Sequence, residues 1–222
     1  MKATFYNIYQ VHKCTANDDI REALNFVHFM DGYAYASNGY VLVRVALTEM
    51  IKNCTSEMIG MINNHSIKGN VFARVIRHKE VEITEHGFGY ANDIDNTEIL
   101  YKWYEIDEDR RIKGFYKYPQ DPQPKIPDFE SVFPVGKDIL IPISAVGINV
   151  QKLCDLSQAM GGVNDRNKET LDLYFTGERN GIICKKSMGR DGYTEDVVGL
   201  IMPCIIDEFY FNPKTTKQNE NL

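Results

Sequence analysis

Apolar residues alternate with small and polar ones between Leu24 and Leu47, a pattern typical of β-strands. Two dipeptides interrupt the alternation, Asp31-Gly32 and Asn38-Gly39, and both are strong signals for tight hairpin turns. The pattern therefore predicts an antiparallel meander of three strands. Its first strand is expected over Ala23–Met30, although the residues from Arg21 to Asn25 also suit a helix.

A short amphipathic helix is expected over Asn70–His78, because its apolar residues recur at helical spacing on one face. The other face is basic, and it carries Arg74, Arg77 and His78, with Lys79 directly after it. Around this helix the sequence predicts strands over Thr4–Val11, Val81–Thr84 and Phe88–Ala91.

The second half of the chain repeats this order of elements. A helix is expected over Val150–Met160, capped by Asn149 and ended by Gly161-Gly162. Apolar, β-branched runs predict strands over Ile139–Ile143, Leu171–Phe175, Ile182–Lys185 and Val197–Ile206. Both halves thus carry a strand, a helix and then a meander, a weak internal repeat with a period of roughly 70 residues.

Proline separates the two halves, since four prolines fall between Tyr116 and Phe133. We expect a first domain over residues 1–118, a linker over 119–134 and a shortened second domain over 135–212. The charged stretch 92–114 is expected to be a long exposed excursion, and the polar tail 213–222 to be disordered.

Charge restricts the possible partners of the chain. The 222 residues carry a net charge of -6 at a pI of about 5.4, so any contact with nucleic acid must be confined to one face. The five cysteines are far apart and form no CxxC pair, which argues against a disulfide framework or a structural zinc site. With no signal peptide or membrane-spanning run in the sequence, these features predict a cytoplasmic protein.

No catalytic motif emerges from the sequence. It contains no Walker loop, no GxSxG and no HExxH, and its five histidines have no metal-ligand spacing. We therefore predict no enzyme activity, no metal and no cofactor. The basic face of residues 70–79 could meet phosphates without reading sequence, although an ordinary solvated face is the alternative. The second helix contributes Lys152 to a nearly neutral face.

Four stretches, in this order, resemble the bacterial sliding clamp, the β subunit of the replicative DNA polymerase. They are REALNFVHFMDGYAYASNGYVLVRVAL, SIKGNVFARVIRHKEVEITEHGFGYA, KIPDFESVFP and GLIMPCII. They resemble the family's R-x-x-LN strand and turn, its following helix and hairpin, its PDY-containing signature and its C-terminal strand. The resemblance implies an α+β, DNA-clamp-like fold of repeated strand-helix-meander units with antiparallel sheets.

The resemblance also implies a function. Clamps encircle double-stranded DNA, hold DNA polymerases and other clamp-binding proteins on it, and catalyse nothing. Their partners insert apolar side chains into a pocket between two domains. Carried over by motif, that pocket comprises Leu24, Ser37, Gly39, Tyr40, Val41, Leu42, Pro134, Leu200 and Met202. Leu42, Leu200 and Met202 lie on predicted strands, so they could instead be core residues. The family's helices face DNA, which favours Arg74, Arg77, His78, Lys79 and Lys152 as DNA contacts.

Departures from the family pattern leave two functions open. The first of the family's three domains has no counterpart here, and the stretch between Pro134 and Val150 is too short for the first half of the family's last domain. Tyr40-Val41 replaces a His-Arg pair, which removes a cation from the pocket. The first hypothesis is a processivity factor that forms a homo-oligomer. The alternative is a monomeric clamp-fold protein that regulates or decoys replication proteins without encircling DNA.

Overall fold

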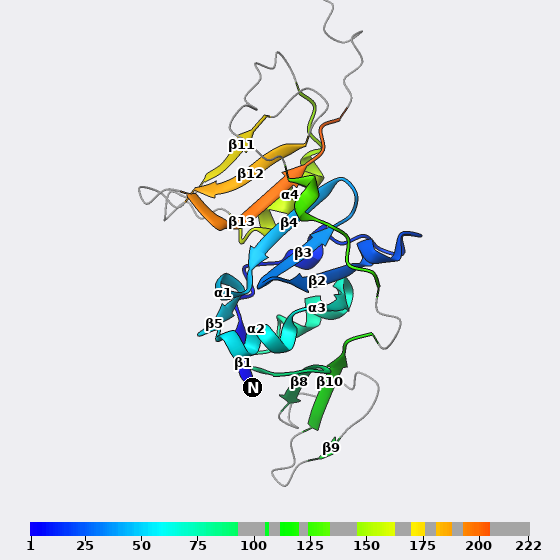
Figure 1. Cartoon of the computed structure of the whole chain (residues 1–222), viewed down its shortest axis with the longest axis vertical. Helices are drawn as coiled ribbons and strands as arrows, with labels where there is room; N and C mark the ends of the chain where they lie inside the picture. Colours follow the sequence, from blue (N-terminus) through cyan, green and yellow to red (C-terminus); the bar gives the residue numbers. More distant parts are fainter. Residues whose placement is uncertain are drawn as a thin grey trace, which may run out of the picture.

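The computed structural model describes residues 1–92, 105–106, 112–119, 124–133, 146–162, 170–175, 181–187 and 193–204. These residues form two antiparallel sheets and a few short helices (Figure 1). The predicted α+β class with antiparallel sheets is therefore confirmed.

The larger sheet has seven strands in the order β11-β12-β13-β4-β3-β2-β6. Their bounds are Thr170–Tyr174, Ile182–Ser187, Tyr193–Ile201, Val41–Ala46, Tyr33–Ser37, Phe26–Met30 and His65–Lys68. The predicted meander is its centre, because β2 pairs with β3 and β3 with β4. Positive φ angles at Asp31 (51°), Gly32 (82°) and Gly39 (86°) form the two turns, as the sequence predicts.

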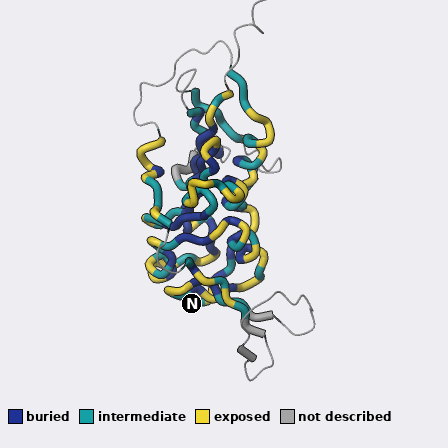
Figure 2. Tube along the Cα trace, turned by 90° about the vertical axis from the view of Figure 1, so that its right-hand side faces the viewer, coloured by how far each residue is buried: buried dark blue, intermediate teal, exposed yellow. Residues whose placement is uncertain are grey.

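The smaller sheet has six strands in the order β5-β1-β7-β8-β10-β9. Their bounds are Ile51–Lys52, Lys2–Phe5, Val81–Thr84, Gly87–Asn92, Ile112–Lys117 and Glu105–Ile106. Phe5 and Phe88 of this sheet meet Phe72 and Phe29 in edge-on aromatic contacts. These rings belong to one buried core that joins the two sheets. Figure 2 shows buried residues concentrated in the interior of the molecule.

Most helices are short, and two of them begin at a side-chain cap. In α2 (Ser56–Ile62), the side chain of Thr55 accepts a hydrogen bond from the backbone N–H of Met58. In α4 (Val150–Ala159), Asn149 accepts from the backbone N–H of Lys152, as predicted. The others are α1 (Leu47–Met50), α3 (Gly69–Val75) and the 3-10 turns η1 (Val11–Cys14), η2 (Glu22–Asn25) and η3 (Glu130–Val132).

Each central strand of the seven-stranded sheet sends alternate residues to two differently covered faces. The helical face of the sheet is covered by η1, α3 and α4, whose buried residues share one core with Val27, Ala36 and Val43. The opposite face presents Tyr35, Leu42 and Leu200, which form a second, smaller cluster with Phe129. The two faces are therefore covered by different segments of the chain.

Several predicted bounds are wrong. The first strand ends at Phe5 rather than Val11, and Val11–Cys14 is a 3-10 turn that packs on the helical face. Residues 22–25 are helical, so the strand begins at Phe26 and the helical alternative for this stretch is confirmed. The helix expected over residues 70–78 ends at Val75, and the last predicted strand ends at Ile201, before Pro203, which has no N–H for pairing.

The predicted domains share a sheet, because β13 of the second pairs with β4 of the first. The division of the chain into two domains stays a prediction. Of the predicted linker, residues 124–133 lie against the seven-stranded sheet, with Phe129 buried. The predicted strand 139–143, most of the excursion 92–114 and the tail 213–222 lie outside the described residues.

Candidate functional site

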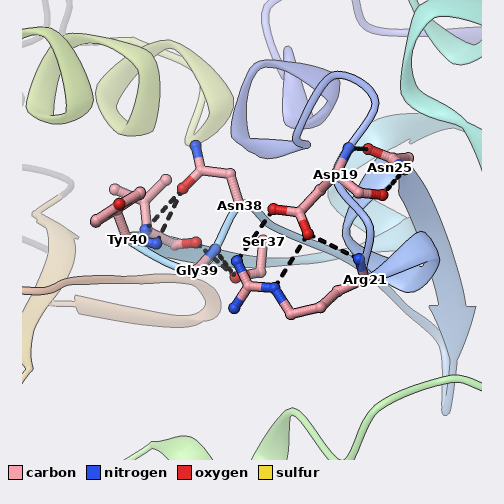
Figure 3. Close-up of polar contacts among 8 residues, drawn as sticks. Asp19, Arg21, Asn25, Ser37, Asn38, Gly39 and Tyr40 are labelled. Atoms are coloured by element: carbon pink, nitrogen blue, oxygen red, sulfur yellow. Dashed lines mark hydrogen bonds and ion pairs between the residues drawn. The ribbon is translucent and has the colours of Figure 1, made fainter.

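Side chains organise the tip of the β3–β4 hairpin (Figure 3). The hydroxyl of Ser37 donates to the carbonyl of Val41 at 2.8 Å and accepts from the N–H of Gly39 at 3.1 Å. Asn38 Oδ1 accepts from the N–H groups of Tyr40 at 3.0 Å and Val41 at 3.2 Å. These bonds fix the turn and direct Tyr40 outward, where its side chain is 63% exposed.

The R-x-x-LN segment, residues 21–25, lies beside this hairpin tip. Asp19 accepts from the backbone N–H, Nε and Nη2 of Arg21 at 2.8, 3.1 and 3.0 Å. The amide of Asn25 donates to the carbonyl of Asp19 and accepts from its N–H. Figure 3 shows Arg21 and Asn25 meeting at Asp19. The guanidinium of Arg21 lies over Gly39, so that a Cβ on Gly39 would sit 3.1 Å from Nη2.

Gly39→Ala is expected to destabilise the fold by about 1–3 kcal/mol, because it would force a side chain into a left-handed conformation and against Arg21. The matched control is Gly60→Ala on α2, where a Cβ meets nothing within 4 Å and φ is ordinary. That change is expected to stabilise by about 0.5–1 kcal/mol. Urea unfolding measures the change in the free energy of unfolding for each variant. Equal changes in Gly39→Ala and Gly60→Ala would contradict this account of the turn.

The predicted partner-binding residues divide by exposure. Tyr40 and Met202 are exposed, at 63% and 40%, and the N–H of Met202 donates to the carbonyl of Tyr40 at 2.8 Å. We call Gly39, Tyr40 and Met202 the docking edge. Lys152 of α4 lies beside it, with Nζ 6.0 Å from the centre of the Tyr40 ring. Leu24 and Ser37 are half-buried, Val41, Leu42 and Leu200 are buried, and Pro134 lies outside the described residues.

Leu42 and Leu200 are covered by residues 124–133, which we call the strap. The ring of Phe129 stacks on Tyr35 at 5.4 Å with an interplanar angle of 8°. Phe129 is 4% exposed and shares a cluster with Leu42 and Leu200. The structure therefore shows these two leucines in a packed cluster, and their role in partner binding stays a prediction.

A polar latch fixes the strap beside Phe129. The carboxylate of Glu130 accepts a hydrogen bond from the Tyr35 hydroxyl at 2.6 Å and two from Arg44 Nη1 at 3.0 Å each. The guanidinium of Arg44 lies 5.0 Å from the ring centre of Tyr33 and 5.4 Å from that of Phe133. Partial burial of Glu130 opposes ionisation, but the bonds from Tyr35 and Arg44 outweigh it and lower the pKa of the carboxyl.

The latch is expected to make stability depend on pH at both ends of the scale. Since the folded pKa of Glu130 lies below 4.5, its contribution is present above pH 4.5 and is lost as the pH falls through the folded pKa. Burial, with the bond to Glu130, raises the pKa of Tyr35 above 10. The contribution of the protonated Tyr35 hydroxyl to stability is therefore lost as the pH rises through the raised value.

Comparison of the wild type with Glu130→Gln by urea unfolding from pH 7 down to pH 3 tests the acidic part of this expectation. The difference in unfolding free energy should be about 1 kcal/mol near neutrality and should shrink as the pH falls through the folded pKa of Glu130. A difference that is independent of pH would show that the ionised latch does not contribute.

The three helical segments that cover the helical face of the seven-stranded sheet carry cations. Arg74 lies on α3, with Arg77 and Lys79 in the turn that follows, and all three are exposed. Lys13 lies on η1 and Lys152 on α4, and η1 packs against both α3 and α4. Burial, reinforced by Lys13 and Arg77, lowers the pKa of His12 to about 4, which places both cations near this ring. We call Lys13, Arg74, Arg77, Lys79 and Lys152 the basic strip.

Lys13 was missed because the sequence separates it from the other members of the strip. The spacing of residues within one helix is enough to identify Arg74. Lys13 lies on η1, and only the tertiary structure shows that η1 packs against both α3 and α4. Acidic residues also occur here, since Asp155 of α4 acts electrostatically on the same buried Cys14 as Lys152. The strip is therefore basic without being free of carboxylates.

His78, which the sequence predicts to contact DNA, packs against two tyrosines of the six-stranded sheet. Its ring stacks on Tyr90 at 4.0 Å, and its Nε2 lies 3.1 Å from the hydroxyl of Tyr116. Burial lowers the pKa of His78, so the ring is neutral at pH 7. The prediction that His78 contacts DNA therefore loses its electrostatic basis, whereas Arg74, Arg77 and Lys79 keep theirs.

The described residues show no arrangement for metal chemistry. No group of three His, Cys, Asp or Glu side chains among them could hold a metal ion. All five cysteines are free thiols, and burial raises the pKa of Cys184 to about 12, which leaves this thiol protonated and unreactive. In the described part of the chain, no helix is long and apolar enough to span a membrane.

No protein-family model matches this sequence, and no curated protein sequence matches it either. The structure is similar to the crystal structure of a putative DNA polymerase III beta subunit from Eubacterium rectale. The two share 8% sequence identity at a TM-score of 0.34, over 93% of this chain and 65% of that chain. This chain thus spans less than two thirds of that protein, and likeness at this level does not establish a shared function.

Proposed function

We propose that this protein is a clamp-like, non-catalytic accessory of DNA replication. It contacts double-stranded DNA through the basic strip and docks DNA polymerase or other clamp-binding proteins at the docking edge. The observation that carries the proposal is the placement of five cations on η1, the α3 region and α4, segments that cover one face of a sheet, in a protein with a net charge of -6. Four motifs that resemble those of sliding clamps, in the same order, support it.

The charge distribution favours contact with phosphates rather than with base edges. An acidic protein repels DNA over most of its surface, so binding depends on one confined basic region. Lysine and arginine side chains at phosphates position a protein without reading the sequence. Each phosphate neutralised releases counterions, and about four contacts give a slope of log K against log salt of about -3 to -4.

Fluorescence anisotropy with two duplexes of equal length and unrelated sequence tests the DNA half of the proposal. The expected result is the same affinity for both duplexes and a salt slope of about -3 to -4. Absence of binding at low salt, or a strong preference for one sequence, would refute sequence-independent contact.

Tyr40 and Met202 are the anchors of the proposed docking edge. A large exposed aromatic ring beside a flexible thioether makes an adaptable apolar surface, and a few such residues supply most of the binding energy at an interface. The double variant Tyr40→Ala, Met202→Ala is expected to weaken capture of a replicative DNA polymerase about 10- to 100-fold. Surface plasmon resonance against immobilised polymerase measures this loss.

The matched control replaces Tyr6 and Ile8 with alanine, because they are comparably exposed, at 44% and 51%, and lie outside the docking edge. Both double variants should unfold at wild-type urea concentrations. If both double variants lose affinity for the polymerase equally, or if neither loses it, the proposal that partners bind at the docking edge is refuted.

A further inference from the structure

The strap is held on its sheet face by side chains rather than by strand pairing. Figure 1 shows it in green, crossing the seven-stranded sheet on the face opposite the helices. Three backbone N–H groups of the strap donate within the strap: Phe129 to Pro127, Val132 to Phe129 and Phe133 to Glu130. Among the described residues, no backbone hydrogen bond joins the strap to a strand. Release of the strap would therefore leave the sheet ladders intact.

The surface under the strap has two adjoining parts with different chemistry. An apolar seat, formed by Tyr35, Leu42 and Leu200, receives the ring of Phe129, and His28 lies 5.5 Å from that ring. Beside it, the Tyr35 hydroxyl and the Arg44 guanidinium receive the carboxylate of the next residue, Glu130. The seat is thus complementary to an aromatic residue followed directly by an acidic residue.

This seat is continuous with the docking edge. Leu42 pairs with Leu200 in the antiparallel register, and the N–H of Met202 bonds to the carbonyl of Tyr40 at the end of the same two strands. A partner segment anchored on Tyr40 and Met202 reaches Leu42 and Leu200 within two residues along either strand, and there it meets Phe129.

We propose that the strap is an internal ligand of this seat, and that a partner segment with an aromatic residue directly followed by an acidic one displaces it. The inference rests on the proposed docking function and specifies the chemistry of the partner. The occupied seat keeps Tyr35, Leu42 and Leu200 out of water while no partner is present. Intramolecular attachment gives the strap a high local concentration, so in the wild type, where the Glu130 latch is intact, only a partner with further contacts at the docking edge competes effectively.

The first test removes the Phe129 side chain from the seat and adds the strap sequence as a separate peptide. The probe is the synthetic peptide IPDFESVF, which has the sequence of residues 126–133. By isothermal titration calorimetry, Phe129→Ala should bind this peptide at least ten-fold more tightly than the wild type. A peptide with alanine in place of its phenylalanine, and one with lysine in place of its glutamate, should not bind the variant. Equal binding to variant and wild type, or binding to neither, would overturn the proposal.

The second test does not depend on the folding of Phe129→Ala. In the milder variant Glu130→Gln, 4-fluorophenylalanine at position 129 reports strap release by fluorine NMR. Saturating IPDFESVF should move the resonance to that of an exposed fluorophenylalanine. A peptide that binds without moving the resonance, or that does not bind, would contradict displacement.

The two proposals fail in different experiments. If the peptide tests fail while duplex DNA still binds with the expected salt slope and Tyr40→Ala, Met202→Ala still loses the polymerase, only the strap inference is overturned. If those two measurements fail while the peptide binds Phe129→Ala, the seat remains and the replication function is overturned.

Discussion

Reversing two charges of the basic strip, with Arg74→Glu and Arg77→Glu, is expected to weaken duplex DNA binding about 100-fold near 0.1 M salt. Both side chains are exposed, one on α3 and one in the turn that follows it. Each substitution removes a phosphate contact and adds a repulsive carboxylate, so the salt slope should also fall by about 2. Fluorescence anisotropy over a range of salt concentrations measures both quantities.

The matched control reverses the same number of charges elsewhere, with Lys52→Glu and Lys125→Glu. Lys52 is exposed on β5, and Lys125 is exposed on the strap, on the other face of the seven-stranded sheet. This pair changes the net charge equally but should weaken binding only a few-fold through long-range repulsion. Equal losses in both double variants would mean that binding follows net charge rather than the basic strip.

Phe129→Ala is expected to lower the free energy of unfolding by about 3–5 kcal/mol, the usual cost of removing a buried phenylalanine ring. Its ring is 4% exposed, and it covers Tyr35, Leu42 and Leu200. The substitution leaves a cavity or uncovers that cluster, and either outcome removes the apolar contacts that hold the strap. Urea unfolding followed by circular dichroism gives the difference.

Val132→Ala provides the comparison within the same strap. Val132 is 51% exposed, so its truncation should change the free energy of unfolding by less than about 0.5 kcal/mol. Similar small losses in both variants would show that Phe129 is not seated in solution as the structure shows it.

Features that depend on near neighbours were predictable from the sequence. Asn38-Gly39 marked a hairpin because only a few residue types tolerate its backbone angles, and the structure has φ of 86° at Gly39. The helix α4 was delimited by its Asn149 cap and by Gly161-Gly162, which adopt φ of 94° and 68°. In both cases the determining interactions lie within a few residues along the chain.

The strap was not predictable, because its contacts join distant parts of the chain. Four prolines suggested a linker between two domains, yet Glu130 bonds to Tyr35 and Arg44, which are 95 and 86 residues away. No local sequence pattern indicates that Tyr35 contacts Phe129 and Glu130 of the strap. For the same reason, the alternation along β4 could not decide whether Leu42 lines an open pocket or is covered.

The end of α3 shows how tertiary contacts override periodicity. The apolar spacing extends the expected helix to His78, but the chain leaves the helix after Val75. There the ring of His78 stacks on Tyr90 and meets Tyr116, both on the six-stranded sheet. That packing separates the four basic residues predicted from this segment into three exposed cations and one neutral, half-buried ring.

The central claim is that duplex DNA lies against the helical face that carries the basic strip. Hydrogen–deuterium exchange of the wild-type protein, with and without a duplex, tests it most directly. The account predicts slower exchange on DNA binding in peptides that cover η1, the end of α3 with the following turn, and the start of α4. It predicts no change in peptides that cover the strap. Protection of the strap alone, or no protection at low salt where a duplex is bound, would contradict the account.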